Sequence, residues 1–390
     1  MRADDTSEAA RAPEPAVEDA IVGDLRTAAY QAYVVGLKRY WSTELYAVVA
    51  SQAAHVAEQP PREIEQAMST SHAYRAFAWL EVHLQQMKYY GRWGLVTLFA
   101  EADDQLAGEL AEGQKREPDK LANDVERPLP DYYVDTDFHQ HRGGIWSDPS
   151  DAFAYEAAAR STTPVASDHG DLHSRFADHV RAITPADGVV LDMGCGFGKT
   201  TEPIRRAMPG ATVVGVDLSP QVLGLAHLRA VQQGLDIRYV QDRQEDLVHF
   251  EDESVDTIAA SMLIHEVPTD VLVQSLREAY RVLKPGGRLV YLDFYEVPGG
   301  NVGRFLILGH STRNNEPFIR SLLAMDFHAE MAAAGFTDVA TTSFEEEPDA
   351  LARGTELPEF WRFPWTLLAG TKPATESAGT TRTADISVAS

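Results

Sequence analysis

The sequence predicts an α/β protein: a doubly wound, mostly parallel sheet of seven strands with an antiparallel hairpin at one edge, preceded by an α-helical domain. Three observations lead to this prediction. Beyond residue 174, short runs rich in β-branched residues alternate with helical patterns, which is typical of parallel sheets with helices on both faces. The last two runs have only loop between them, which predicts the edge hairpin. Before residue 114 the periodicity is helical alone.

The stretch 18–113 is predicted to form the α-helical domain. Apolar residues recur there at spacings of three and four, which places them on one helix face. Pro60 and Pro61 end the first helix, and glycines interrupt the second before a third runs to about Leu110. We expect a small bundle or a helical cap. The first stripe is Tyr30, Val34, Leu37, Trp41, Leu45 and Val48, and the second is Tyr74, Phe77, Leu80, Leu84 and Met87.

Composition indicates the boundaries of the other segments of the chain. Residues 1–17 and 372–390 lack an apolar period and are predicted to be a disordered leader and a disordered tail. Residues 114–130 are rich in charge and proline, so we interpret them as a linker. A second unit, 131–174, is irregular and rich in aromatic residues and histidine: Tyr132, Tyr133, Phe138, His139, His141 and Trp146.

The stretch 175–371 holds the strands of the predicted sheet. A turn at Lys284-Pro285-Gly286-Gly287 stops a helix and allows the chain to reverse, and Pro298–Ile319 is interpreted as an insertion before the next helix. The runs expected to be parallel strands are Val189–Met193, Thr212–Val216, Ile237–Val240, Val255–Ala260 and Arg288–Phe294, and the expected hairpin joins Phe336–Phe344 to Phe363–Leu368.

A glycine-rich loop follows the first of these strands. Glycines at alternate positions permit a tight turn and the close approach of a ligand at the carboxyl edge of the sheet, where open α/β sheets bind ligands. A nucleotide P-loop is excluded because Met193 stands where its first glycine is required. A dinucleotide site is disfavoured because Lys199 stands where its third glycine is required. The loop residues are Asp192, Gly194, Gly196 and Gly198.

The pattern Asp-x-Gly-x-Gly-x-Gly resembles motif I of class I S-adenosylmethionine-dependent methyltransferases, and the resemblance covers about residues 175–371. It implies a Rossmann-like core with S-adenosyl-L-methionine as cofactor. By this resemblance, the glycine loop packs on the methionine and ribose, and Asp192 holds the amino-acid end. Asp217 matches the acid that accepts both ribose hydroxyls, for which a carboxylate has two acceptor oxygens. Leu218 would pack on the adenine.

Further segments continue the resemblance. Residues 240–247 are similar to the loop that meets the adenine edge, which makes Asp242, Arg243 and Gln244 candidate contacts, and Ser261 after the fourth strand is another candidate cofactor contact. The turn at 284–287 is similar to that of ubiquinone/menaquinone-type methyltransferases. In this family the segment before the first strand often forms a lid, so 131–174 is expected to cover the substrate.

Histidines supply the candidate proton-transfer groups. Methyl transfer to a neutral hydroxyl or an acidic C–H requires a base, and histidine is the commonest one. His265 follows the fourth strand at the functional edge, and His139 and His141 lie in the expected lid. A plain structural role stays open for each, because His265 also suits a residue that shapes the loop and the pair suits an aromatic patch. Two histidines without an identifiable third ligand predict no metal site.

Composition limits the classes of molecule that this protein is expected to bind. Lys plus Arg number 34 and Asp plus Glu number 59, for a net charge of -25, which disfavours nucleic acid and anionic membrane surfaces. Cys195 is the only cysteine, so neither a disulfide within the chain nor a cysteine-cluster metal site is expected. No apolar run reaches the length of a membrane span, and no signal-peptide pattern is present. We expect a cytoplasmic protein, with a homodimer through the N-terminal helices as one form of assembly.

The sequence therefore predicts S-adenosylmethionine-dependent methyl transfer to a small-molecule acceptor. The resemblance suggests C- or O-methylation of an aromatic or polyketide-like metabolite, which is an inference at the level of the fold. Two alternatives stay open. One is a cofactor-binding scaffold that acts through a partner without turnover. The other is an enzyme of the same fold with different chemistry, such as a cyclase.

Overall fold

The computed structural model describes residues 17–142, 144, 147–159, 168–344 and 356–374. The predicted leader and tail lie outside the described residues, apart from Val17 and positions 372–374. Trp146 of the expected lid also lies outside them.

The core is one eight-stranded sheet with the strand order β1-β4-β3-β2-β5-β6-β8-β7. The five strands predicted as parallel pair in parallel, and the last two form the antiparallel edge, with β8 between β6 and β7. β6 begins earlier than expected because it continues through the predicted turn at 284–287. The bounds are β2 Val189–Met193, β3 Thr212–Asp217, β4 Arg238–Gln241, β5 Val255–Ser261, β6 Leu283–Asp293, β7 Thr337–Ser343 and β8 Thr366–Thr371.

The sheet has one strand more than the sequence predicted. β1 (Leu121–Ala122) pairs in parallel with β4, at the edge opposite the hairpin and inside the stretch interpreted as a linker. Two residues are too few to produce an alternating pattern, so nothing in the sequence marks this strand. Leu121 is buried, and β1 fixes the linker to the sheet.

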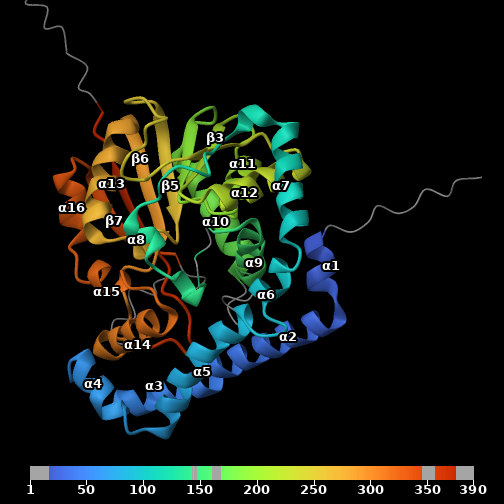
Figure 1. The fold of residues 1–390 in the computed structure, drawn as a ribbon. Helices are drawn as coiled ribbons and strands as arrows, with labels where there is room; N and C mark the ends of the chain where they lie inside the picture. Colours follow the sequence, from blue (N-terminus) through green and yellow to red (C-terminus); the bar gives the residue numbers. More distant parts are fainter. Residues whose placement is uncertain (1–16, 143, 145–146, 160–167, 345–355, 375–390) are drawn as a thin grey trace, which may run out of the picture.

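Helices cover both faces of the sheet in a doubly wound arrangement (Figure 1). One apolar core joins the sheet to α13 and α16, and a second joins its other face to α10 and α11. The outer side of α12 packs against α7 and α9. The bounds are α7 Asp103–Arg116, α9 Pro149–Ala159, α10 Asp168–Ile183, α11 Thr201–Ala207, α12 Pro220–Gln233, α13 Thr269–Val282 and α16 Phe327–Ala333.

The N-terminal helices form a layer along one side of the molecule, and α14 lies between this layer and the sheet (Figure 1). The sequence did not predict α14, which spans Gly300–Asn314 within the expected insertion. Phe305 and Leu306 of α14 share a buried apolar cluster with Val34 and Phe77. The other bounds are α1 Val17–Gly23, α2 Leu25–Tyr40, a π-helical segment Trp41–Leu45, α3 Tyr46–Ala54, α4 Pro61–Met68, α5 His72–Tyr89 and α6 Leu95–Ala100.

The π-helical segment shifts the buried face of the first long helix. The sequence placed Val48 on the apolar stripe, but Val48 is 46% exposed and Val49 is fully buried. A π turn carries one residue more than an α turn, so the buried position after Leu45 moves from a spacing of three to a spacing of four. Such segments are frequent at functional sites, and Trp41 at its start lines the cavity described below.

Candidate active site

A cavity of about 280 Å³ lies at the carboxyl ends of β2, β3 and β5, between the sheet and the N-terminal helices. Segments that are far apart in the chain meet in its wall. The sheet side contributes the glycine loop and the ends of the strands, and the opposite side contributes α2, α5 and α14. The short helix α8 (Asp131–Val134) and the 3-10 turn Phe138–Gln140 also line the cavity. Both belong to the segment that was expected to form a lid.

The glycine loop is fixed by backbone hydrogen bonds to the end of β3. The amides of Gly194 and Cys195 both donate to the carbonyl of Val216, and the amide of Gly196 donates to Asp217 Oδ2. Gly194 and Gly196 line the cavity, whereas Gly198 does not. Gly194, Gly196 and Gly198 all have positive φ angles, of 69°, 53° and 88°, which side chains rarely adopt.

Gly198→Ala is expected to destabilise the fold by about 1–3 kcal/mol, because the alanine would be strained at φ 88° and its Cβ would lie 2.8 Å from the buried Tyr239 Oη. Denaturant unfolding measures this change. The matched control is Gly36→Ala on the exposed side of α2, where a Cβ meets no atom within 4 Å and helix propensity favours alanine. Equal stability of the two variants would contradict the strained conformation of the loop.

Asp217 ends β3 with its carboxylate at the cavity wall, next to Leu218. Its Oδ1 accepts from the amide of Ser219 at 2.9 Å, and its Oδ2 accepts from the amide of Gly196 at 2.9 Å. Burial raises the pKa of Asp217, and the amides that donate to it oppose this effect. The carboxylate thus holds the loop and the start of α12 while it faces the cavity.

Asp192 lies beneath the loop and does not line the cavity, whereas the resemblance implied that it holds the amino-acid end of the cofactor. It is fully buried, its Oδ2 accepts from the hydroxyl of Thr201 at 2.5 Å, and its Oδ1 has no partner among the described residues. Burial raises its pKa to about 7. Ser261 does line the cavity, and its hydroxyl lies 2.7 Å from that of Thr200.

The candidate adenine contacts divide into two groups. Asp242 and Gln244 are buried and line the cavity, and Gln244 Oε1 is a buried acceptor without a partner in the described part of the chain. Arg243, the third candidate, is absent from the cavity wall, and its guanidinium donates to the carbonyl of Pro128.

His265 is clamped between two carboxylates. Its Nδ1 lies 2.7 Å from Oδ1 of Asp293, the last residue of β6, and its Nε2 lies 3.3 Å from Glu266 Oε1. Asp293 also accepts from the amides of Ile264 and Phe294, so it anchors the 3-10 turn Ile264–Glu266 to the edge of the sheet. His265 is therefore held in place through both ring nitrogens.

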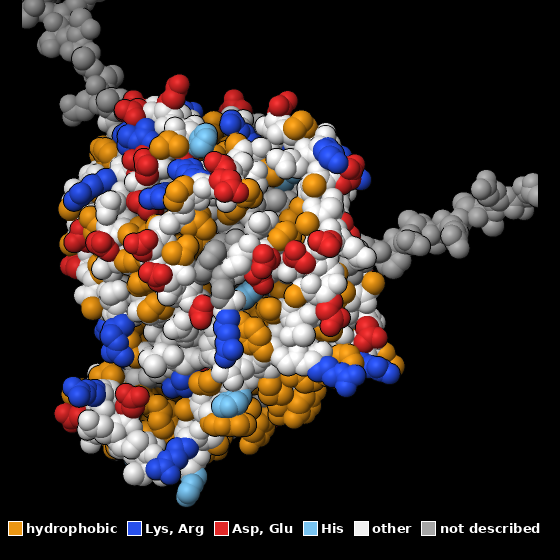
Figure 2. Space-filling model, viewed as in Figure 1, with side chains coloured by type: hydrophobic (Ala, Val, Ile, Leu, Met, Phe, Trp, Pro, Cys, Tyr) orange, Lys and Arg blue, Asp and Glu red, His pale blue; other side chains and the backbone are white. Residues whose placement is uncertain are grey.

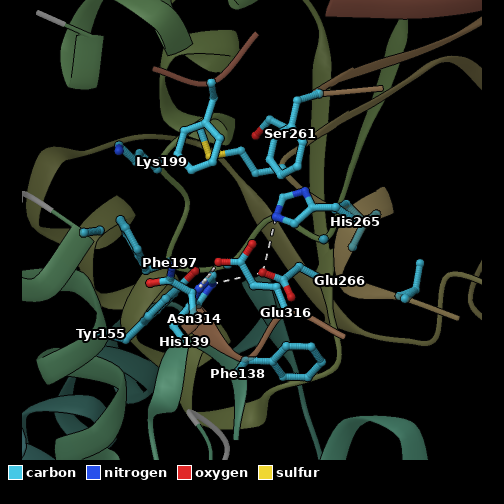
Figure 3. Close-up of a pocket in the computed structure, with 18 of the residues that line it drawn as sticks. Phe138, His139, Tyr155, Phe197, Lys199, Ser261, His265, Glu266, Asn314 and Glu316 are labelled. Atoms are coloured by element: carbon cyan, nitrogen blue, oxygen red, sulfur yellow. Dashed lines mark hydrogen bonds and ion pairs between the residues drawn. The ribbon is translucent and has the colours of Figure 1, made fainter. Parts of the chain in front are cut away.

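The pairs around His265 are part of a longer series in which acidic side chains and histidines alternate, which we call the acid–histidine chain. Figure 3 shows part of it. Glu266 Oε1 also lies 2.9 Å from Nε2 of His139, whose Nδ1 lies 3.1 Å from Glu316 Oε1. Nε2 of His310 lies 3.6 Å from the same Glu316 oxygen. The chain ends at Glu81 on α5, which receives His310 Nδ1 at 2.6 Å and pairs with Arg313.

This arrangement favours charged histidines. Burial acts to lower the pKa of both rings, but Asp293 and Glu266 raise the pKa of His265 well above its ordinary range. In the same way, Glu266 and Glu316 raise the pKa of His139 to about 9. The histidines in turn hold the pKa values of Glu266 and Glu316 below their ordinary range, against the effect of burial. The raised pKa values of His265 and His139 favour carboxylate–imidazolium pairs with their acidic neighbours at neutral pH.

His141, the third candidate proton-transfer group, is not part of this series of acids and histidines. It is buried, its Nε2 lies 3.1 Å from Asp151 Oδ1, and its ring packs 5.0 Å from that of Tyr89. It does not line the cavity, so it braces the wall from behind. Within the described residues, no group of three or more His, Cys, Asp or Glu side chains is arranged to hold a metal ion.

Several residues of the site were missed by the reasoning from sequence: four that line the cavity, and Asp293, which lies behind its wall and holds His265. Asp293 follows the apolar run Leu289–Leu292 at the functional edge of the sheet, and that position was a signal. Polar residues on an apolar helix face were another signal, because Glu81 and Lys88 share a face with Leu84, and Lys38 shares one with Val34 and Trp41. Glu316 carries no comparable signal. The missed residues are Lys38, Glu81, Lys88, Asp293 and Glu316.

A doubly wound sheet with a glycine loop after its first core strand, an acid at the end of the next strand and a cavity at the carboxyl edge defines a cofactor-binding α/β domain. Residues 190–287 match the family model described as a methyltransferase domain. The core of this chain is therefore a class I S-adenosylmethionine-dependent methyltransferase domain.

Known relatives match part of this chain. The demethylmenaquinone methyltransferase of Thermus thermophilus is 32% identical over 148 residues, which cover 38% of this chain and 65% of that protein. The ubiquinone biosynthesis O-methyltransferase of Xanthomonas axonopodis pv. citri is 33% identical over 116 residues, which cover 30% of this chain and 47% of that protein. The chain spans about half the length of the curated relatives that it matches.

Among solved structures, phosphoethanolamine N-methyltransferase 2 of Haemonchus contortus in complex with S-adenosyl-L-methionine is 16% identical, with a TM-score of 0.41 over 58% of each chain. No helix within the described ranges is both long and apolar enough to cross a membrane.

Proposed function

We propose that this protein transfers the methyl group of S-adenosylmethionine to a small-molecule acceptor inside the cavity. One observation carries the proposal: the glycine loop, the Asp217 carboxylate and the acid–histidine chain all border the same cavity. C- or O-methylation of an aromatic or polyketide-like body is the finer part of the proposal. The aromatic wall contributed by Trp41, Trp361 and Phe294 supports it.

The residues at the sheet edge fit this cofactor. Gly196 has open space where a Cβ would stand, so a ligand can approach its backbone closely. Asp217 offers carboxylate oxygens to the ribose hydroxyls, and the unpaired Oε1 of Gln244 offers an acceptor to the adenine amine. When bound, S-adenosylmethionine supplies a methyl carbon attached to a positively charged sulfur, and the protein supplies position and environment.

Glu266 is the group that we assign to the acidic hydrogen of the acceptor. It lines the cavity, and its Oε2 is buried without a partner among the described residues. A hydroxyl on the acceptor would donate to this oxygen and release its proton there as the new bond to carbon forms. His265 and His139 act on Glu266 rather than on the acceptor, because both of their ring nitrogens already face carboxylates. They are positioning residues that keep Glu266 ionised and oriented.

A chain that begins near Asp131 is expected to aggregate or to lose acceptor turnover while it keeps some affinity for S-adenosylmethionine. Removal of the N-terminal helices exposes Phe305 and Leu306 of α14 and removes the cavity wall that carries Trp41. Size-exclusion chromatography with light scattering, followed by calorimetric titration of the cofactor, measures both effects. A soluble, monodisperse and fully active shortened chain would make the helices an independent appendage.

Three further expectations belong to this proposal. Hydrophobic side chains gather over α2 and α5 at the lower edge of Figure 2, where Leu25, Tyr33, Tyr40 and Trp79 are largely exposed, and this supports a homodimer through these helices. The single cysteine supports a reducing compartment such as the cytoplasm. The acidic net charge supports a small molecule rather than nucleic acid as the partner.

The two alternatives are distinguished by the products. A non-catalytic scaffold would bind S-adenosylmethionine without forming S-adenosylhomocysteine. A cyclase of the same fold would convert its substrate without adding a methyl group. Mass spectrometry of small molecules that purify with the full chain, before and after addition of the cofactor, separates both from methyl transfer.

A further inference from the structure

Two lysines enter the cavity from the N-terminal helices. Lys38 lies on α2 and Lys88 on α5, and Lys88 is only 4% exposed. Within the described part of the chain, neither ammonium group forms a hydrogen bond or ion pair, and Lys88 Nζ has only the ring of Tyr89, 4.6 Å away. Buried lysines are rare unless they are paired, so these two require another source of negative charge.

The nearby carboxylates do not supply that charge. Glu81 and Glu316 are close enough to act on Lys38 electrostatically, and Glu316 also acts on Lys88. Glu81 is already engaged by Arg313, His310 and Asn314, and Glu316 is engaged by His139. The two lysines also repel each other, since Lys38 lowers the pKa of Lys88.

We propose that Lys38 and Lys88 form the anion-binding subsite of the acceptor, which takes a carboxylate or phosphate group on an aromatic or apolar body. The neighbouring wall suits such a ligand, because Trp41, Leu84 and Tyr89 line the cavity beside the two lysines. This proposal rests on the proposed function and names its substrate class: an acidic acceptor whose charged end points toward the N-terminal helices. It also gives those helices a direct part in substrate selection.

Proton uptake on binding follows from the surroundings of the lysines. Burial lowers the pKa of Lys38 to about 8 and that of Lys88 well below its ordinary range, despite the favourable effect of Glu316 on both and of Glu81 on Lys38. A fraction of these amines is therefore neutral in the empty cavity near neutral pH. An anion favours the charged form and raises both pKa values, so its binding takes up protons and weakens as the pH rises.

The test is calorimetric titration of the full-length protein with benzoate, phenyl phosphate and the neutral analogue benzamide. We expect at least one of the two anions to bind about tenfold or more tightly than benzamide, the range of a hydrogen bond to a charged group. Lys88→Met and Lys38→Met should each remove about tenfold or more of that affinity and leave benzamide binding unchanged. Titrations in buffers of different ionisation enthalpy should show proton uptake with the wild type and less with Lys88→Met.

The matched control is Lys115→Met on the exposed side of α7, which should bind all three probes like the wild type. Tight binding of benzoate alone identifies a carboxylate, and tight binding of phenyl phosphate alone identifies a phosphate. The proposal is overturned if neither anion binds better than benzamide, or if both lysine variants retain full anion affinity. Loss of turnover with full anion affinity in Lys88→Met would instead make Lys88 a proton acceptor. A failure of the proposed function is seen separately, as wild-type protein that does not bind S-adenosylmethionine.

Discussion

Replacement of His265 by alanine is expected to lower kcat about 10²–10⁴-fold, the range for loss of acid–base assistance, and to leave the affinity for S-adenosylmethionine nearly unchanged. The variant removes the cation that lies between Asp293 and Glu266, so two buried carboxylates lose their shared partner. Glu266 then loses the partner that holds it in its orientation toward the acceptor. Single-turnover kinetics with the acceptor measure the effect on the chemical step.

Stability must be measured beside activity, because an uncompensated buried charge also destabilises the fold. His265→Gln keeps a side-chain donor for one of the two carboxylates and should retain part of the rate. His328→Ala is a matched control, since His328 lies on α16 and pairs with the hydroxyl of Thr341 away from the cavity. Single-turnover rates of His265→Ala equal to those of the wild type would show that His265 has no part in the chemical step.

The pH dependence separates a positioning role from that of a simple histidine base. A free histidine base would make the rate fall with acid through its ordinary pKa near 6.5, which is what reasoning from sequence predicts. In the structure both rings are protonated at neutral pH, so that fall should be absent. The rate should instead decline in alkali as His139 loses its proton at about pH 9. The stabilising effect of His139 has the same sign, since it is complete below pH 6.5 and is lost through about pH 9.

Asp217→Asn is expected to weaken the binding of S-adenosylmethionine by about 1.5–3 kcal/mol, the range for hydrogen bonds to a charged group. The amide keeps the shape of the carboxylate and one acceptor oxygen, so it preserves part of the contact with the amides of Gly196 and Ser219. It loses the second acceptor and the charge that the ribose hydroxyls would meet. Calorimetric titration gives the affinity, and Asp217→Ala should weaken binding at least as much.

Two comparisons make this result interpretable. Asp246→Asn is the matched control because Asp246 is exposed and does not line the cavity. NADH should bind poorly to the wild type, since the third glycine of a dinucleotide loop is replaced by Lys199. Unchanged cofactor affinity in Asp217→Asn would refute the assignment of the ribose contact.

Local patterns explain why most of the sheet was predictable. The strands ending at Met193 and Asp217 are mostly apolar runs, and the glycine loop that follows the first of them is a contiguous motif. Each can therefore be recognised without knowledge of its neighbours in space. β1 was not predictable because its two residues take their conformation from pairing with β4. The phase shift that buries Val49 depends on the π-helical segment, which leaves no mark on the spacing of apolar residues before it.

The acid–histidine chain was beyond local reasoning for another physical reason. His139 and Glu316 are 177 positions apart in the chain and meet only because α14 closes over the carboxyl edge of the sheet. His265 itself was predictable from its place after a parallel strand. Its charge state was not, because this depends on Asp293 at the end of the neighbouring strand and on Glu266 beside it.

The most direct test of the central claim uses S-adenosylmethionine with a deuterated methyl group. The full-length protein is incubated with this cofactor and with a small-molecule extract of its source organism, and the products are analysed by mass spectrometry. We expect one acidic metabolite to gain the deuterated methyl group and S-adenosylhomocysteine to form in equal amount. Asp217→Asn should reduce both at limiting cofactor concentration. Bound cofactor with no S-adenosylhomocysteine formed, or a converted metabolite without the label, would contradict that claim.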